Sequence, residues 1–424
     1  MTRRPRRASE PSRKLGGKIK GRDLGGPPRR PASVKEEDNV AGMSTANVAA
    51  TPFEGFVLGI ETSCDDTACA VLDAEGRVLS SVVSSQLDVH RPFGGVVPEA
   101  ASREHLRNWP AVSAAALEEA GVDWSDIGAV AATRGPGLVG SLLVGLSLGK
   151  AISYSLGVPF LAVHHLEGHL FSPLLQTGGA SRSVPESMVG LVVSGGHTSL
   201  LAVDGPSGAV TSLAETRDDA IGEAFDKIGH RVGLPFPAGA EVDRLAELGD
   251  PAAQPFRVAR IKSDELAFSY SGLKSQALRA LGEIDGYGDE PAAKAEPART
   301  PAHPVGGPDP AGIERDDESW PRDVLDLLAG FRRAAVAQLI DRLDRLSDER
   351  PVERLSVSGG VAANRLLRRE VALWGERRGA DVLLVPLRYC GDNAAMIAHA
   401  GLLRLRRGDT DDPRSADAES RIPF

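Results

Sequence analysis

The sequence repeats one order of elements, and this repeat limits the folds that the chain can adopt. Three short apolar runs, separated by Asp, Glu and Gly residues as in hairpins, open each half. The runs are residues 56–61, 67–73 and 77–83 in the first half, and 189–197, 198–204 and 209–215 in the second. We therefore predict an α/β fold of two related halves that face each other across a central cleft.

Helices and further strands follow each set of three runs. In the first half these are a helix at 99–120, a strand at 129–135 and a helix at 138–157; in the second they are a helix at 220–232, strands at 354–360 and 381–386, and helices at 362–374 and 392–407. In sheets of this kind, ligands bind where strand ends and helix starts bring backbone amides together. We expect a binding site at these junctions.

Composition divides the chain into structured and unstructured parts. Residues 1–50 are rich in Arg, Pro, Gly and Ser without apolar periodicity, which predicts a disordered basic tail, either an RNA-attracting arm or a dispensable extension. Residues 281–319 are rich in Pro, Ala, Gly and Asp and predict a disordered insertion. The two lobes are then 56–165 and 166–407, followed by a C-terminal tail at 408–424.

Charge and cysteine content exclude several classes of protein. The net charge is −9, and because residues 1–42 carry twelve Lys or Arg against five Asp or Glu, the remainder has a charge of −16. An RNA partner must therefore use a local basic patch or a helper protein. Three scattered cysteines form neither a disulfide framework nor a CxxC zinc site. The absence of a long apolar run or a secretory signal predicts a cytoplasmic enzyme without membrane association.

Two histidines in VHHLEGH, residues 163–169, have the spacing of metal ligands. On the helix predicted here, His165 and His169 are four residues apart and share one face, whereas His164 points elsewhere. The protease motif HExxH places Glu directly after the first His, but Glu167 stands two residues after His165. This moves the carboxylate by about 100° around the helix and disfavours peptide hydrolysis. The alternative is a pair of helix-surface histidines.

Carboxylates follow two other predicted strands. In GIETSCDDT, residues 59–67, Asp65 and Asp66 are suited to orienting a metal, a water or a phosphate, although the same residues suit a capped hairpin turn. In CGDNAAMIAHAG, residues 390–401, Asp392 stands at a predicted helix start. It is either the N-cap of that helix or a third ligand beside the histidine pair.

Two strands run into the sequence Ser-Gly-Gly. The amides of Ser194, Gly195 and Gly196 can approach a phosphate closely because glycine has no side chain. At the second junction, Gly359 and Gly360 precede a helix whose first turn holds Asn364. Two such junctions in one chain predict a nucleotide-binding cleft.

Seven motifs, taken together, resemble the TsaD family of tRNA threonylcarbamoyladenosine transferases. They are GIETSCDDT, VHHLEGH, VSGGHT, DDAIGEAFDK, FSYSGLK, SVSGGVAANR and CGDNAAMIA, in the family's order, between about Phe56 and Arg407. The resemblance implies two RNase-H-like lobes of the actin and sugar-kinase (ASKHA) superfamily. It also implies transfer of threonylcarbamoyl from threonylcarbamoyl-AMP to the exocyclic amine of the adenosine 3′ to the anticodon in tRNAs that read ANN codons. AMP is released, and TsaB-like and TsaE-like helper proteins assist.

The family's site residues can be placed on this sequence. The resemblance implies one divalent metal ion per chain, iron(II) or alternatively zinc, on His165, His169 and Asp392. It implies substrate contacts at Val192, Val193, Ser194, Gly195, Gly196, Asp226, Gly239, Asp243 and Asn364. Asp65 is our candidate for orienting the attacking amine or taking its proton, by analogy of position.

The sequence departs from the family at two places. The family's PGGP segment reads PAGA here, with Ala238 and Ala240 replacing Gly and Pro, so the backbone of that substrate loop differs in composition. Asp66 stands where Glu is common, which shortens one carboxylate arm by a methylene.

Three other functions remain open at this point. A small-molecule kinase of the same superfamily would share the cleft but does not need the HxxxH pair. A metalloprotease would need the misplaced Glu167. A non-catalytic ATP-driven scaffold would leave the histidines unexplained.

Overall fold

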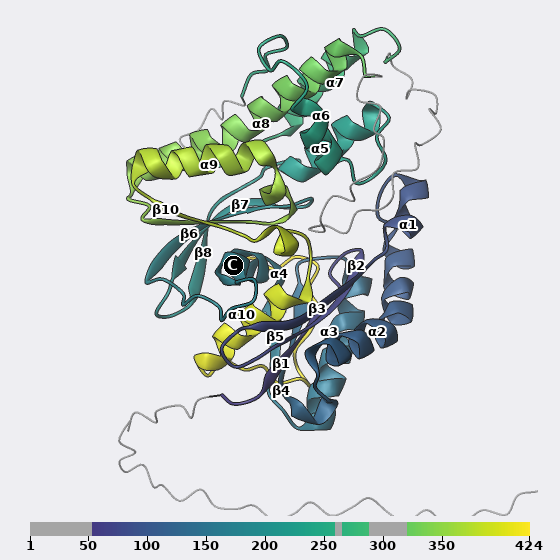
Figure 1. Ribbon diagram of the computed structural model, residues 1–424, viewed down its shortest axis with the longest axis vertical. Coiled ribbons are helices and arrows are strands. Elements are labelled where there is room, and N and C mark those ends of the chain that lie inside the picture. The colour runs from purple at the N-terminus through teal and green to yellow at the C-terminus, as the bar shows by residue number, and fades with distance from the viewer. Residues whose placement is uncertain (1–52, 259–264, 288–319) are drawn as a thin grey trace, which may run out of the picture. The chain divides into compact units, whose positions relative to one another are not determined.

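The computed structural model describes residues 53–258, 265–287 and 320–424 (Figure 1). The predicted tail at 1–50 and residues 288–319 of the predicted insertion lie outside the described residues. The first seven residues of that insertion are described, and the helix before it ends at Gly282.

The first half forms a five-stranded sheet. Its strands are β1 (Phe56–Glu61), β2 (Asp66–Leu72), β3 (Val78–Ser85), β4 (Ile127–Gly135) and β5 (Phe160–His164). The order in the sheet is β3-β2-β1-β4-β5. Strands β1 to β3 form an antiparallel meander, whereas β4 and β5 run parallel to β1. The central strands are buried, as expected for a sheet that is covered on both faces.

The second half repeats this topology. Its strands are β6 (Ser187–Val193), β7 (Thr198–Asp204), β8 (Ala209–Glu215), β9 (Arg354–Ser358) and β10 (Asp381–Leu384). The order is β10-β9-β6-β7-β8, with β6 to β8 antiparallel and with β9 and β10 parallel to β6. The prediction of two related α/β halves is confirmed.

Ten α-helices and several short 3₁₀ helices lie between or after the strands in the described part of the chain. The α-helices are α1 (Leu87–His90), α2 (Pro98–Ala120), α3 (Val139–Leu156), α4 (His165–Phe171), α5 (Ile221–Arg231), α6 (Gly239–Ala246), α7 (Ser271–Gly282), α8 (Arg322–Glu349), α9 (Arg365–Arg378) and α10 (Ala394–Arg406). The 3₁₀ helices are η1 (Arg91–Phe93), η2 (Trp124–Asp126), η3 (Ser172–Leu174), η5 (Gly360–Ala363) and η6 (Leu387–Tyr389). The helix predicted at 362–374 starts only at Arg365, because Asn364 caps it.

The last helix and the C-terminal residues pack on the first sheet. Helix α10 lies against β1 and β2, on the other face from α2 and α3 (Figure 1). Gly59 allows this approach, because a Cβ there would lie 2.2 Å from the carbonyl oxygen of Ala394. Beyond α10, the Asp411 amide donates to the Phe160 carbonyl. The predicted second lobe, 166–407, therefore contains a helix that buries its apolar face on the first sheet, which follows from long-range packing and not from local sequence.

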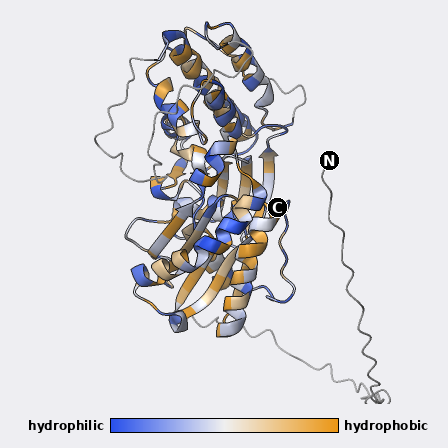
Figure 2. Cartoon of the chain, turned by 90° about the vertical axis from the view of Figure 1, so that its right-hand side faces the viewer, coloured by the Kyte–Doolittle hydropathy of each residue, from blue (hydrophilic) through white to orange (hydrophobic). Residues whose placement is uncertain are grey.

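Helix α3 is the one described helix long and apolar enough to cross a membrane by length and composition. It packs against β4 and α2, and 33% of its apolar stretch is buried. Figure 2 shows the side of the chain that carries α2 and α3, where hydrophobic ribbon lies among hydrophilic elements.

Candidate active site

The histidine pair stands where β5 ends and α4 begins. The structure places Val163 and His164 in the strand and starts the helix only at His165, so the helix predicted over 163–169 is shorter at its N-terminus. His165 and His169 lie one turn apart with ring centroids 4.7 Å from each other, and both are buried. The ring of His164 turns away and stacks on Phe424. The reading of the pair as surface histidines is therefore wrong.

Asp392 reaches both histidines from the segment before α10. Its Oδ1 accepts a hydrogen bond from His169 Nε2 at 3.1 Å and lies 3.6 Å from His165 Nε2. Asn393 is the N-cap of α10, since its side chain accepts from the Met396 amide. Asp392 is thus not needed as a cap, and its carboxylate is directed at the histidine pair.

The three side chains fit a divalent metal ion. One ligand atom from each of His165, His169 and Asp392 lies within 4.8 Å of the others. The second ring nitrogen of His169, Nδ1, is buried and has no hydrogen-bond partner in the described part of the chain. Two imidazoles and one carboxylate form a donor set suited to iron(II) or zinc, with further coordination positions open.

The opposite charges buried in this site stabilise one another and shift the pKa values of its residues. Burial alone would raise the pKa of Asp392, but the charge of His165 and the hydrogen bond from His169 hold it well below its usual range. Burial alone would lower the pKa of His165, but the Asp392 and Glu61 carboxylates raise it to about 9. A metal ion would have to displace this proton, because only neutral imidazole binds metal.

Glu61 is a site residue that the sequence analysis did not single out. It is fully buried at the end of β1, and its Oε2 accepts from His165 Nδ1 at 3.1 Å and from the Thr133 hydroxyl at 2.7 Å. Its Oε1 accepts from the Ser63 amide. The only signal in the sequence was its place at the end of a strand, within GIETSCDDT.

The two aspartates of the turn after β1 lie near the triad. The negative charge of Asp392 contributes to raising the pKa of both Asp65 and Asp66, after the larger effect of burial. For Asp66 the pKa rises to about 8. This shared charge effect indicates that the predicted catalytic residue, Asp65, lies near the predicted metal ligand Asp392, and its catalytic role stays a prediction.

The two Ser-Gly-Gly junctions lie side by side at the ends of β6 and β9. Val192 and Val193 are buried in β6, and a tight turn follows, in which the Ser194 amide donates to the His197 carbonyl at 2.8 Å. Gly359 has a φ of +91°, and a Cβ there would lie 2.3 Å from the Val193 carbonyl oxygen. Glycine is therefore required for this close approach.

Gly195 and Gly196 have open space where a side chain would be. Their backbone N–H groups donate no hydrogen bond within residues 53–258, 265–287 and 320–424. His197, which follows them, is a second residue that the sequence analysis missed. Burial, together with the charges of His165 and His169, lowers the pKa of its ring to about 4, and the effect of these charges indicates that the ring lies near the triad.

The remaining predicted substrate residues form two pairs. Asp226 accepts from the amides of Ala238 at 2.8 Å and Gly239 at 3.0 Å. Asp243 accepts from Arg332 at 2.9 Å and from the Arg365 amide at 3.1 Å, beside Asn364, whose side chain accepts from the Leu367 amide. Each of these polar side chains thus has an internal partner, and their contact with substrate stays a prediction. Ala238, which replaces a glycine of the family's PGGP segment, is buried against Gly229.

Glu167 does not face the histidine pair as a protease base would. Burial raises the pKa of its carboxyl, and Arg404 and Arg407 of the α10 region oppose this effect. Its main electrostatic partners are therefore these arginines and not the residues of the triad.

Comparison with known proteins decides the family. The family model for TsaD, tRNA N6-adenosine threonylcarbamoyltransferase, matches residues 77–399. The chain belongs to this family. Proteins of this name from Sorangium cellulosum and Anaeromyxobacter dehalogenans are 42% and 44% identical to it, over 84% of this chain and 93% and 96% of their own lengths.

Solved structures confirm the fold class of this TsaD-family chain. HypF from T. kodakarensis superposes with a TM-score of 0.51 at 14% identity, covering 84% of this chain and 48% of that one. A full-length HypF in the phosphate- and nucleotide-bound form gives a TM-score of 0.51 at 12% identity. The predicted enzyme class, a transferase that places threonylcarbamoyl on tRNA adenosine, is confirmed by the family. The kinase and metalloprotease alternatives have no comparable support.

Proposed function

We propose that this chain transfers threonylcarbamoyl from threonylcarbamoyl-AMP to the adenosine 3′ to the anticodon, at a metal centre between its two sheets. The observation that supports the proposal is the convergence of His165, His169 and Asp392 beside the open Ser194–Gly196 turn. A divalent ion held there, iron(II) or alternatively zinc, would supply Lewis-acid polarisation of the donor.

The chain's own residues bind the donor and direct the attack. The amides of Gly195 and Gly196, which have no acceptor in the described part of the chain, would donate to the phosphate of the adenylate, as backbone amides do in phosphate-binding turns. Asp65 orients the adenine amine and takes its proton as the new N–C bond forms, and AMP leaves. The raised pKa of Asp65 makes its carboxylate a better proton acceptor than an exposed aspartate.

The metal assignment is tested with the full chain, purified and loaded with iron(II) or zinc. Transfer of labelled threonylcarbamoyl from the adenylate to tRNA is measured for the wild type, for His165→Ala and for His399→Ala as a second buried histidine outside the triad. We expect His165→Ala to lose transfer and bound metal together while remaining folded. Full activity of His165→Ala would refute the metal centre.

The cellular reaction is tested by nucleoside analysis of tRNA from cells depleted of this protein. We expect the level of threonylcarbamoyladenosine to fall in tRNAs that read ANN codons. The proposed location of the enzyme is the cytoplasm. An unchanged level would contradict the proposed reaction.

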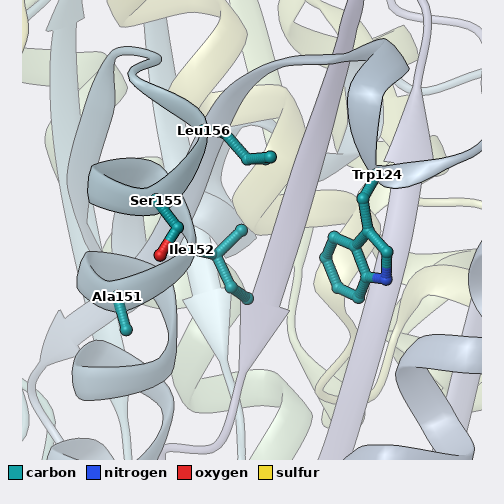
Figure 3. Close-up of a pocket in the computed structure, with 5 residues that line it drawn as sticks. All are labelled: Trp124, Ala151, Ile152, Ser155 and Leu156. Atoms are coloured by element: carbon teal, nitrogen blue, oxygen red, sulfur yellow. The ribbon is translucent and has the colours of Figure 1, made fainter.

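An exposed apolar face on α3 supports the proposal that a helper protein binds this chain. Leu143 and Tyr154 are 46% and 76% exposed, and Trp124 of η2 closes a shallow depression against Ile152 and Leu156 (Figure 3). Patches of this kind commonly mark protein interfaces. We assign this face to a TsaB-like partner. A TsaE-like protein and tRNA are the other expected partners, and tRNA must use a local basic patch or a helper protein because the body of the chain is acidic.

The interface is tested by binding of the purified TsaB-like protein to the wild type and to Leu143→Glu. A charged side chain in a desolvated apolar contact should weaken binding by about tenfold or more. Exposed Glu118→Gln on α2 is the matched control. Unchanged binding to Leu143→Glu would place the partner on another surface.

A further inference from the structure

A chain of buried polar side chains lies beneath the turn that carries Asp65 and is not used by the proposed mechanism. Its members are Thr67, Gln86, His90 and His105, each at most 2% exposed. They come from β2, from the residue before α1, from α1 itself and from α2. One end of the chain contacts the Cys64 carbonyl, and the other contacts the loop after η1.

The hydrogen-bond partners at the two ends of this network determine which ring nitrogen of His90 and of His105 carries the proton. The Val97 amide can only donate, so His90 Nδ1 accepts it at 3.2 Å, and a neutral His90 donates from Nε2 to Gln86 Oε1 at 3.3 Å. At the other end the Cys64 carbonyl can only accept, so His105 Nε2 donates to it at 3.1 Å.

The middle of the chain agrees with both ends. His105 Nδ1 must accept, and it lies 3.1 Å from Gln86 Nε2 and 2.8 Å from the Thr67 hydroxyl, which are both donors. Gln86 Nε2 also donates to Thr67 Oγ1 at 3.3 Å. One amide orientation and one tautomer of each imidazole therefore agree with all six contacts, with both rings neutral and with the single lone pair of His105 Nδ1 shared between two donors.

A buried network of this kind is more than core filling. Apolar residues of similar volume would fill the same space without desolvating polar groups, whereas a fully satisfied network specifies one geometry. Here that geometry fixes the Cys64 carbonyl through His105, and the backbone N–H of Gln86, which continues the pairing of β2 with β3, donates to the Asp65 carbonyl at 3.0 Å. Both anchors act on the backbone that carries Asp65.

The outer end of the network reaches the second half of the molecule. Gly94, in the loop between η1 and α2, adopts a φ of +68°, and a Cβ there would lie 3.6 Å from the His230 ring on α5. Figure 1 shows α1 and the N-terminal end of α2 on the side of the molecule that faces α5. The loop thus lies beside His230 of the second half, while Val97 at its end is hydrogen-bonded to His90 and, through His90, to Gln86 of the network.

We propose that His90, Gln86 and His105 are positioning residues of the transfer site, which hold the Cys64–Asp66 turn in register with the loop that contacts α5. The inference rests on the proposed function only for its catalytic consequence. The geometric consequence, a turn held rigid by His105 and Gln86, can be measured without any activity.

The first test is hydrogen–deuterium exchange of the peptide that spans residues 62–67, in the full-length chain. We expect faster exchange in His105→Leu and in Gln86→Leu than in the wild type, and no change in the exposed control Gln176→Leu. Wild-type exchange in both network variants would overturn the proposal, whether or not the chain transfers threonylcarbamoyl. If His105→Leu does not fold, Gln86→Leu and Thr67→Val carry the same test.

The second test is the rate of transfer at saturating tRNA and adenylate. A displaced catalytic turn should lower kcat by about 100-fold in His105→Leu with little change in KM or in bound metal. His105→Gln retains a donor for the Cys64 carbonyl and should recover about tenfold of this loss. A merely structural role would not distinguish Leu from Gln in this way. Wild-type kcat in His105→Leu, or equal losses in the Leu and Gln variants, would overturn the positioning role.

Discussion

Replacing Glu61 by glutamine should weaken metal binding at the triad while leaving the fold intact. The Glu61 carboxylate accepts three hydrogen bonds, from His165 Nδ1, the Thr133 hydroxyl and the Ser63 amide. A glutamine offers one oxygen and one NH₂ group in the same volume. One of its two ends must therefore present a donor to another donor, and the charge that holds the His165 N–H is lost.

The magnitude follows from that lost contact. A hydrogen bond to a charged group contributes roughly 1.5–3 kcal/mol, which corresponds to about a 10- to 150-fold increase in the Kd for metal. The loss of groups that orient a metal ligand commonly has an effect of this size. His165 would remain present, so binding is weakened and not abolished.

The assay is a competition titration of metal-free protein with zinc or cobalt(II) against a chelator of known affinity. Exposed Glu118→Gln is the control for loss of one carboxylate, and circular dichroism checks the fold. Cobalt(II) also reports the ligand geometry through its visible spectrum. A Kd within about twofold of the wild type, in a folded Glu61→Gln protein, would refute the claim that Glu61 orients His165 for the metal.

Three further predictions concern the rest of the chain. Gly359→Ala places a Cβ against the Val193 carbonyl at a φ of +91°, and a loss of about 1–3 kcal/mol should appear in urea unfolding, whereas an unchanged midpoint would contradict the close packing of the two junctions. Arg332→Ala leaves Asp243 buried without its cation and should cost about 3–5 kcal/mol in the same assay; a loss below about 1 kcal/mol would show that the pair is solvated. Burial lowers the pKa of His399 to about 3, so its contribution to stability is present above the unfolded pKa near 6.5 and is lost as the pH falls toward 3. His399→Leu should remove this part of the acid destabilisation between those pH values, and an unaltered pH dependence would refute it.

Parts of the site could be predicted from the sequence because they are formed by residues close together in the chain. The His165–His169 spacing places two ligands on one helical face, and each Ser-Gly-Gly turn is written in consecutive residues. The role of Asp392 was not readable from spacing, since an aspartate at a helix start is equally an N-cap. The neighbouring Asn393 takes that cap in the structure, and this leaves Asp392 for the histidines.

Other parts depended on contacts between distant segments. Nothing local in the sequence marks Glu61 as a partner of His165, which is 104 residues away, or His105 as a partner of the Cys64 carbonyl. The docking of α10 on the first sheet depends on its fit against Gly59, which strand periodicity does not reveal.

The sequence by itself determined the two-fold repeat of strands, the histidine pair and the family, because periodicity, spacing and motif order are properties of neighbouring residues. The tertiary structure decided which carboxylates meet that pair. It also decided which buried donors and acceptors satisfy one another, because such pairings depend on how two separately folded sheets bring residues from distant parts of the chain within hydrogen-bonding distance.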